Sequence, residues 1–171
     1  FQHTLVAHDW DGKTPIPYLA RPWTDSPDGK VYTFKLRDDV QFCSGKKFTA
    51  ADVVYSIKRL ISPELKAPLA WRAGILKDIR ATDKYTVEYE LNEPFSDLLL
   101  NLTMFTTAIH NKESVEALGK DYGTKAADGT GPWCFESWQP RTEIVLKRHD
   151  AYKWGPSMYQ NKGPVKFEKL S

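Results

Sequence analysis

The sequence has few of the features that would tie it to a membrane or to nucleic acid. Its longest apolar stretches are only a few residues, such as residues 98–100, whereas a membrane-spanning helix needs about 20. The sequence also lacks a large excess of charge of one sign, because 24 basic residues against 22 acidic residues leave a formal net charge of +2. That balance argues against a nucleic-acid partner and indicates an ordinary mixed surface.

The sequence opens on Phe1 and not on an initiator methionine. Residues 1–6 lack both a charged start and a long apolar run, so they do not look like a signal peptide. We therefore expect a mature chain or a segment of a longer parent.

Motifs for catalysis and metal binding are absent as well. There is no G-x-S-x-G elbow, no H-E-x-x-H, and the four histidines are scattered. The glycine cluster at residues 129–131 lacks the Lys-Ser/Thr of a phosphate loop, so a sharp turn entering a strand is the simpler interpretation. Asp38 and Asp39 adjoin a strand end and are typical of a turn. The sequence thus predicts no enzyme, no resident cofactor and no metal site, and a hydrolase is the least favoured function.

Alternating apolar residues predict a small sheet. Residues 31–37 and 85–91 each alternate between apolar and polar positions, as half-buried strands do. Asp83 and Lys84 form a plausible turn from a preceding strand at 76–81, which gives an antiparallel pair with one wet face.

Three helices are expected around this sheet. The first covers residues 50–61, with Thr49 as N-cap and Asp52 as a shortened version of the capping-box glutamate. The second covers 95–102, and the third covers 112–118 between Asn111 and Gly119.

The end of the chain is turn-rich and strand-like. Runs at 133–138 and 143–148 predict a hairpin, and a short strand is expected at 165–167. The predicted fold class is α+β, with helices packed on a small antiparallel or mixed sheet. The side chains expected to be largely buried are Tyr32, Phe34, Val54, Ile57, Val87 and Tyr89.

The order of several motifs resembles that of family-five, or cluster C, extracytoplasmic solute-binding proteins of ABC importers, which include peptide- and nickel-binding members. Each motif is weak alone, but together they follow the family's order and intervals. In chain order they are PYLARPW at 17–23, DGKVYTFKLRD at 28–38, FCSG and FTAADV at 42–45 and 48–53, GTGPW at 129–133 and DAYKW at 150–154.

This resemblance implies part of an α/β lobe that closes over a ligand together with a second lobe. Residues 11–115 then correspond to an accessory subdomain of lobe I and residues 116–171 to part of its main sheet, with the second lobe absent. The implied function is a periplasmic, monomeric binding component that captures oligopeptides or similar small solutes for a membrane permease. The alternative is a haem or metal-chelate carrier of nickel type, which a cleft-facing His110 would favour.

Two segments are candidates for ligand contact by the same resemblance. Trp71 is close to where the nickel-binding relative carries a pocket tryptophan. Thr103, Met104, Phe105 and Thr106 occupy the place where family members expose cleft-lining side chains after a helix. Methionine and phenylalanine give adaptable apolar contact, although packing in the core is an equal alternative for them.

The two cysteines, Cys43 and Cys134, are expected to form a disulfide. An even count in a protein exported to the periplasm favours pairing, and the bridge would close a loop of 91 residues. Two buried free thiols are the alternative.

Overall fold

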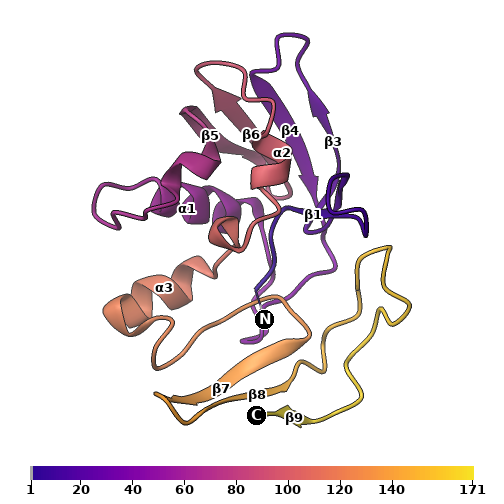
Figure 1. The fold of residues 1–171 in the computed structure, drawn as a ribbon, viewed down its shortest axis with the longest axis vertical. Helices are drawn as coiled ribbons and strands as arrows, with labels where there is room; N and C mark the ends of the chain where they lie inside the picture. Colours follow the sequence, from indigo (N-terminus) through magenta and orange to yellow (C-terminus); the bar gives the residue numbers. More distant parts are fainter. Residues whose placement is uncertain (1) are drawn as a thin grey trace.

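A four-stranded antiparallel sheet carries the first half of the chain in the computed structural model, which describes residues 2–171 (Figure 1). The opening residue, Phe1, lies outside the described residues. In spatial order the strands are β3 (Ala20–Asp25), β4 (Val31–Leu36), β6 (Thr86–Leu91) and β5 (Leu76–Asp83). The predicted strands at 31–37 and 85–91 are confirmed, and so is the hairpin that joins β5 to β6.

The two faces of this sheet differ as their alternating sequences predict. Phe34, Val87 and Tyr89 point to one face and are fully buried. On the other face Arg80 makes ion pairs with Glu88 and Glu90 of the neighbouring strand, and these side chains stay partly exposed. The expected sheet with one wet face is therefore confirmed.

Helix α1 (Ala50–Leu60) covers the apolar face. Its first turn is closed by Asp52, whose carboxylate accepts hydrogen bonds from the backbone N–H and the hydroxyl of Thr49 at 3.0 and 3.1 Å. Within the helix, Ile57 is buried in the core, whereas Val54 is only half-buried. The rest of the predicted core set is buried as expected.

The other helices are short. Helix α3 (Lys112–Leu118) begins at Asn111, whose side chain accepts from the backbone of Glu113 and Ser114, and it ends at Gly119 as predicted. Helix α2 spans only Leu98–Asn101, so the expected 95–102 helix is too long. Most of the difference lies at its start, where the N–H of Leu98 donates to the carbonyl of Phe95 at 3.0 Å and closes a turn, and at its end the Thr103 hydroxyl donates to the carbonyl of Leu100. The described chain also contains the 3-10 helices η1 (Ala70–Ala73), η2 (Phe105–Thr107) and η3 (Gly119–Asp121).

A second sheet carries the last part of the chain. Strands β7 (Trp133–Gln139) and β8 (Glu143–Arg148) form the predicted hairpin. The final strand is β9 (Lys169–Leu170), not 165–167, because the backbone of Arg148 bonds to that of Glu168 at 2.8 Å and sets the pairing later in the chain. Between β8 and β9 a long loop runs up beside the N-terminal segment (Figure 1).

The two parts of the chain are tied together by covalent and polar links. Cys43 and Cys134 form the expected disulfide, with their Cα atoms 5.7 Å apart. Beside it the carboxylate of Asp128 accepts hydrogen bonds from the side chains of Ser44 and Asn111. The glycine-rich segment at 129–131 is thus the turn that enters β7, as expected.

Among the described residues there is no helix long and apolar enough to cross a membrane.

Candidate ligand-binding groove

Three adjoining hollows meet at the ring of Tyr18 and form one groove, which we call the Tyr18 groove. The largest has a volume of about 630 Å³ and is lined mainly by aromatic side chains and the loop at 158–163. The second, about 360 Å³, shares His3 and Tyr18 with it and extends to Thr103 and Phe105. The third, about 170 Å³, shares Tyr18, Met158 and Tyr159 with the first.

Backbone pairing fixes the floor of this groove. The carbonyl of His3 accepts from the N–H of Ile109 at 2.8 Å, and that of Thr4 accepts from Leu19 at 3.3 Å. Strands β1 (Val6–His8) and β2 (Pro15–Pro17) then form a tight antiparallel pair that leads into Tyr18. Main-chain hydrogen bonds therefore position His3 and Tyr18, and both residues line the first two hollows.

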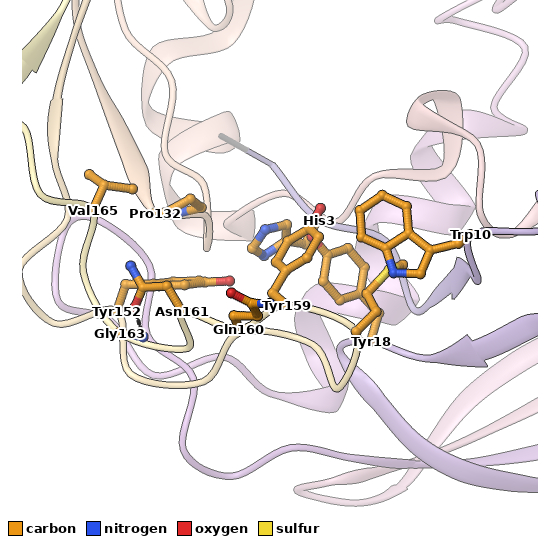
Figure 2. Close-up of a pocket in the computed structure, with 11 residues that line it drawn as sticks. His3, Trp10, Tyr18, Pro132, Tyr152, Tyr159, Gln160, Asn161, Gly163 and Val165 are labelled. Carbon is orange, nitrogen blue, oxygen red and sulfur yellow. Dashed lines mark hydrogen bonds between the residues drawn. The ribbon is translucent and has the colours of Figure 1, made fainter.

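The rings on the floor are in contact with one another. The imidazole of His3 lies 4.5 Å from the ring of Tyr18, 5.9 Å from that of Tyr152 and 4.9 Å from that of Trp154, measured between ring centroids. Such separations are typical of stabilising aromatic pairs. Figure 2 shows His3 and Tyr18 of this cluster between Trp10 on one side and Tyr152 on the other.

A closed loop forms the outer wall. The N–H of Gly155 donates to the carbonyl of Lys162 at 3.0 Å, which draws residues 155–162 into a ring of chain. Within it, the ring of Tyr159 lies 6.4 Å from that of Trp10, so the wall meets the β1–β2 segment across the hollow.

The groove holds no fixed charge in the part of the chain that the structure describes. No Asp, Glu, Lys or Arg among residues 2–171 lines any of the three hollows. Burial lowers the pKa of His3 to about 3, so its imidazole is neutral at physiological pH. Burial also raises the pKa of Tyr18, and that of Tyr152 to about 12, so both phenols keep their protons.

The predicted ligand-contact residues fall into separate places. Thr103 and Phe105 line the Tyr18 groove, and Phe105 is 79% exposed. Trp71 is also exposed, but it lines a different hollow of about 230 Å³ with Ile75 and Phe95.

Two further predicted residues line neither the Tyr18 groove nor the hollow at Trp71. Met104 is half-buried, and its carbonyl accepts from the backbone and the hydroxyl of Thr107. The hydroxyl of Thr106 is buried without a hydrogen-bonding partner, as is Nε of Arg72 in η1. Neither Met104 nor Thr106 is among the residues that line the Tyr18 groove.

Sequence reasoning missed the aromatic residues that dominate the groove. These residues come from both ends of the described chain: His3, Trp10 and Tyr18 near its start, and Tyr152 and Tyr159 near its end. Their one shared signal is the high aromatic content of 13%, which does not say which rings meet.

His110 and His149 contact other residues of the fold and do not line the Tyr18 groove. Nδ1 of His110 lies 2.9 Å from Nε2 of Gln2 and 3.1 Å from the hydroxyl of Tyr122, and burial lowers its pKa to about 4. His149 lies with Cys43 and Cys134 in a group whose ligand-type atoms are within 4.8 Å of one another. Both sulfurs of that group are already joined in the disulfide.

The described residues thus form an α+β unit with a groove lined mainly by rings, and this combination belongs to the class of solute-binding proteins that the comparisons identify. The chain matches the family described as "Bacterial extracellular solute-binding proteins, family 5 Middle" over residues 14–171, and it belongs to that family.

Individual relatives agree with this assignment. The chain is 30% identical to the nickel-binding periplasmic protein of Escherichia coli K12 over 158 residues, which cover 88% of this chain and 29% of the relative. It is 33% identical to di/tripeptide-binding protein 1 of Pseudomonas aeruginosa UCBPP-PA14 over 175 residues, covering 89% and 32%.

A solved structure gives the same result. It is the periplasmic binding protein DppA of Helicobacter pylori, in complex with the peptide STSA. The match is 31% identical with a TM-score of 0.79, and covers 98% of this chain and 35% of that one. The chain thus spans about a third of the length of the proteins it matches, and these relatives carry the names of binding proteins rather than of enzymes.

Proposed function

We propose that this chain forms part of one lobe of a periplasmic binding protein that captures oligopeptides or similar small solutes for an ABC importer. The observation that carries the proposal is the Tyr18 groove, an uncharged, aromatic-lined surface whose hollows share Tyr18. Capture of a solute needs shape complementarity and exclusion of water, and a concave, largely apolar surface supplies both. No nucleophile or general base is part of the proposed mechanism.

The proposed division of the lobe follows the four-stranded and the three-stranded sheet. Residues 11–115 would form the accessory subdomain and residues 116–171 part of the main sheet of lobe I, with the disulfide between Cys43 and Cys134 joining them. A second lobe, outside this chain, would close over the groove and meet the charged termini of a peptide. A monomeric binding protein of this kind would deliver its ligand to a membrane permease.

Within the groove we assign ligand contact first to Phe105 and Thr103. Phe105 is 79% exposed next to Thr103, and an exposed aromatic ring buries a large apolar area when a ligand covers it. Trp71, Met104 and Thr106 remain candidates for contact at the neighbouring surface formed by η1 and η2.

Titration of a longer chain that contains these residues tests the proposal. Isothermal calorimetry with di- to tetrapeptides should give saturable binding, and haem and nickel chelates should bind more weakly. A carrier of haem or nickel chelates would show the reverse order of affinity.

Residues 1–171 alone provide a second test. They should bind the same peptides about a thousandfold more weakly, because one wall leaves half of the ligand facing water while the entropic cost of capture remains. Tight peptide binding by residues 1–171 alone would contradict the two-lobe proposal.

A further inference from the structure

The largest hollow of the groove has the shape and lining of a side-chain pocket. Its volume is about 630 Å³, and it is open on one side between the β1–β2 segment and the 155–162 loop. Trp10 stands at its rim and is 78% exposed, while Tyr18, Tyr152 and Tyr159 form its sides. A flat ring that enters would face aromatic surface on more than one side.

The polar groups of this hollow are neutral. The side chains of Gln160 and Asn161 offer amide donors and acceptors, and Tyr18 and Tyr152 offer phenol hydroxyls. His3, at the floor, is neutral, and its Nδ1 already has a hydrogen-bonding partner in the hydroxyl of Thr130, 3.2 Å away. The hollow is thus equipped for hydrogen bonds at the edge of a ligand group and has no side-chain charge to neutralise an ion.

This lining discriminates against ionised ligand groups. An ammonium or carboxylate group that left water for this hollow would lose its hydration and find no opposite charge in return. An aromatic ring would instead gain apolar burial together with ring-to-ring contacts at the usual 4.5–7 Å. Arg37 does not line the hollow: its guanidinium lies over the ring of Trp154, 5.1 Å from the centroid, and pairs with Asp39.

We propose that this hollow is a specificity subsite that selects an uncharged aromatic side chain of the bound peptide. The inference rests on the proposed function, since it assigns one pocket of the same groove. It adds the substrate class: peptides that carry Phe, Tyr or Trp, in preference to peptides that carry Lys, Arg, Asp or Glu at the corresponding position.

The walls come from segments far apart in sequence, so the subsite is a product of the fold. Trp10 follows β1, Tyr18 follows β2, and Tyr159 lies in the loop between β8 and β9. The ring centroids of Trp10 and Tyr159 lie 6.4 Å apart at the rim, with the two rings tilted by 51°. Removal of either ring therefore opens the rim and leaves the buried side chain of His3 in place.

The test uses a longer chain that contains these residues and a set of tripeptides in which Phe, Tyr, Leu, Ala, Lys or Glu is placed at each position in turn. At one position the Phe and Tyr peptides should bind about tenfold more tightly than the Ala peptide. The Lys and Glu peptides should bind more weakly than the Ala peptide at that position.

Variants then locate the preference. Trp10→Ala and Tyr159→Ala should each reduce the ratio of Phe to Ala affinity to about threefold or less. Trp138→Ala is the matched control, because this partly exposed tryptophan lies on β7 and should leave the ratio unchanged.

The possible failures are distinguishable. Equal affinity for the six residue types at every position, or an aromatic preference that survives both rim variants, would overturn the subsite and leave the proposed function standing. Tighter binding of the Lys peptide would also overturn it, since the rings would then act as a cation-binding cage. Absence of binding to every peptide would overturn the proposed function and the subsite together.

Discussion

The backbone of Gly155 lies directly against that of Lys162. A Cβ atom at position 155 would lie 2.8 Å from Cα of Lys162 and 3.0 Å from the carbonyl oxygen of Asn161. Backbone atoms at such a distance cannot give way as a flexible side chain would, so only glycine fits at this crossing. The close approach is what holds residues 156–161 as a wall of the groove.

Gly155→Ala is therefore expected to open the wall. Cleavage by chymotrypsin after Tyr159 should be about tenfold faster than in the parent, because the loop loses its closing contact. Gly163→Ala is the control: a Cβ there would meet only Oδ1 of Asn161 at an ordinary 3.6 Å, so cleavage should be unchanged. Equal cleavage rates for the two variants would contradict the role assigned to the crossing.

Removal of the disulfide should destabilise the protein strongly. In the chain-entropy account, a bridge that closes a 91-residue loop contributes about 4–5 kcal/mol to the free energy of unfolding. Urea denaturation of the Cys43→Ala/Cys134→Ala variant measures the loss. A reducing agent should lower the stability of the parent and leave that of the double variant unchanged, and an unaffected parent would count against the estimate.

Truncation of Ile57 tests the packing of α1 on the sheet. Ile57 is 1% exposed, so Ile57→Ala should lower the free energy of unfolding by about 2–5 kcal/mol. Ile61, at the end of the same helix, is 36% exposed, and Ile61→Ala should cost less than about 1 kcal/mol. Similar losses for both variants would mean that the helix does not pack as described.

Acid should weaken the fold before the carboxylates titrate. Burial lowers the pKa of His3 to about 3 and that of His110 to about 4, below the usual 6.5 of the unfolded chain. Below pH 6.5 the unfolded state binds more protons than the folded state. The contribution of the two neutral imidazoles to the free energy of unfolding is therefore complete above pH 6.5 and is lost as the pH falls. Each histidine adds a slope of up to about 1.4 kcal/mol per pH unit.

Urea denaturation at several pH values between 7.5 and 5 measures this slope. His110→Gln should make it shallower, because one of the two imidazoles whose pKa burial lowers is gone. His8→Gln should leave it unchanged, because His8 is exposed on β1. A slope that His110→Gln does not alter would contradict the assignment.

Phe105 separates ligand contact from folding. Because its ring is 79% exposed, Phe105→Ala should leave the melting temperature within about 1 °C of the parent. In a longer chain that contains these residues, the same change should weaken peptide affinity about fivefold or more, as measured by calorimetry. A variant that melts earlier but binds normally would make Phe105 a packing residue.

Local patterns in the sequence were sufficient for most elements of the fold. Alternation placed β4 and β6, and the caps at Thr49 and Asn111 placed α1 and α3. The pattern failed for α2, where Leu98, Leu99 and Leu102 suggested a longer helix than the four residues observed. A turn closed by the hydrogen bond from the Leu98 N–H to the Phe95 carbonyl precedes the helix, and such a local hydrogen bond leaves no trace in the spacing of apolar residues.

The site was only partly predictable for a different reason. Phe105 and Thr103 could be singled out because they follow a helix at a position that resembles the family's cleft. The rings of Trp10, Tyr18 and Tyr159 carry no local signal, since their neighbours in space are remote in sequence.

By itself, the sequence determined the strands β4 to β8, the helices α1 and α3 and their apolar faces, because each of these patterns lies within a short stretch of the chain. The order of its motifs also determined the family that it resembles, whereas it gave no prediction of β1, β2 or β3. Only the tertiary structure decided that His3, Tyr18 and Tyr152 meet, that the 155–162 loop closes beside Trp10, and that Trp71 lies at a separate hollow. The physical reason is that the groove is assembled by long-range main-chain hydrogen bonds and by a disulfide across 91 residues, and the distances that these links set cannot be inferred from spacing along the chain.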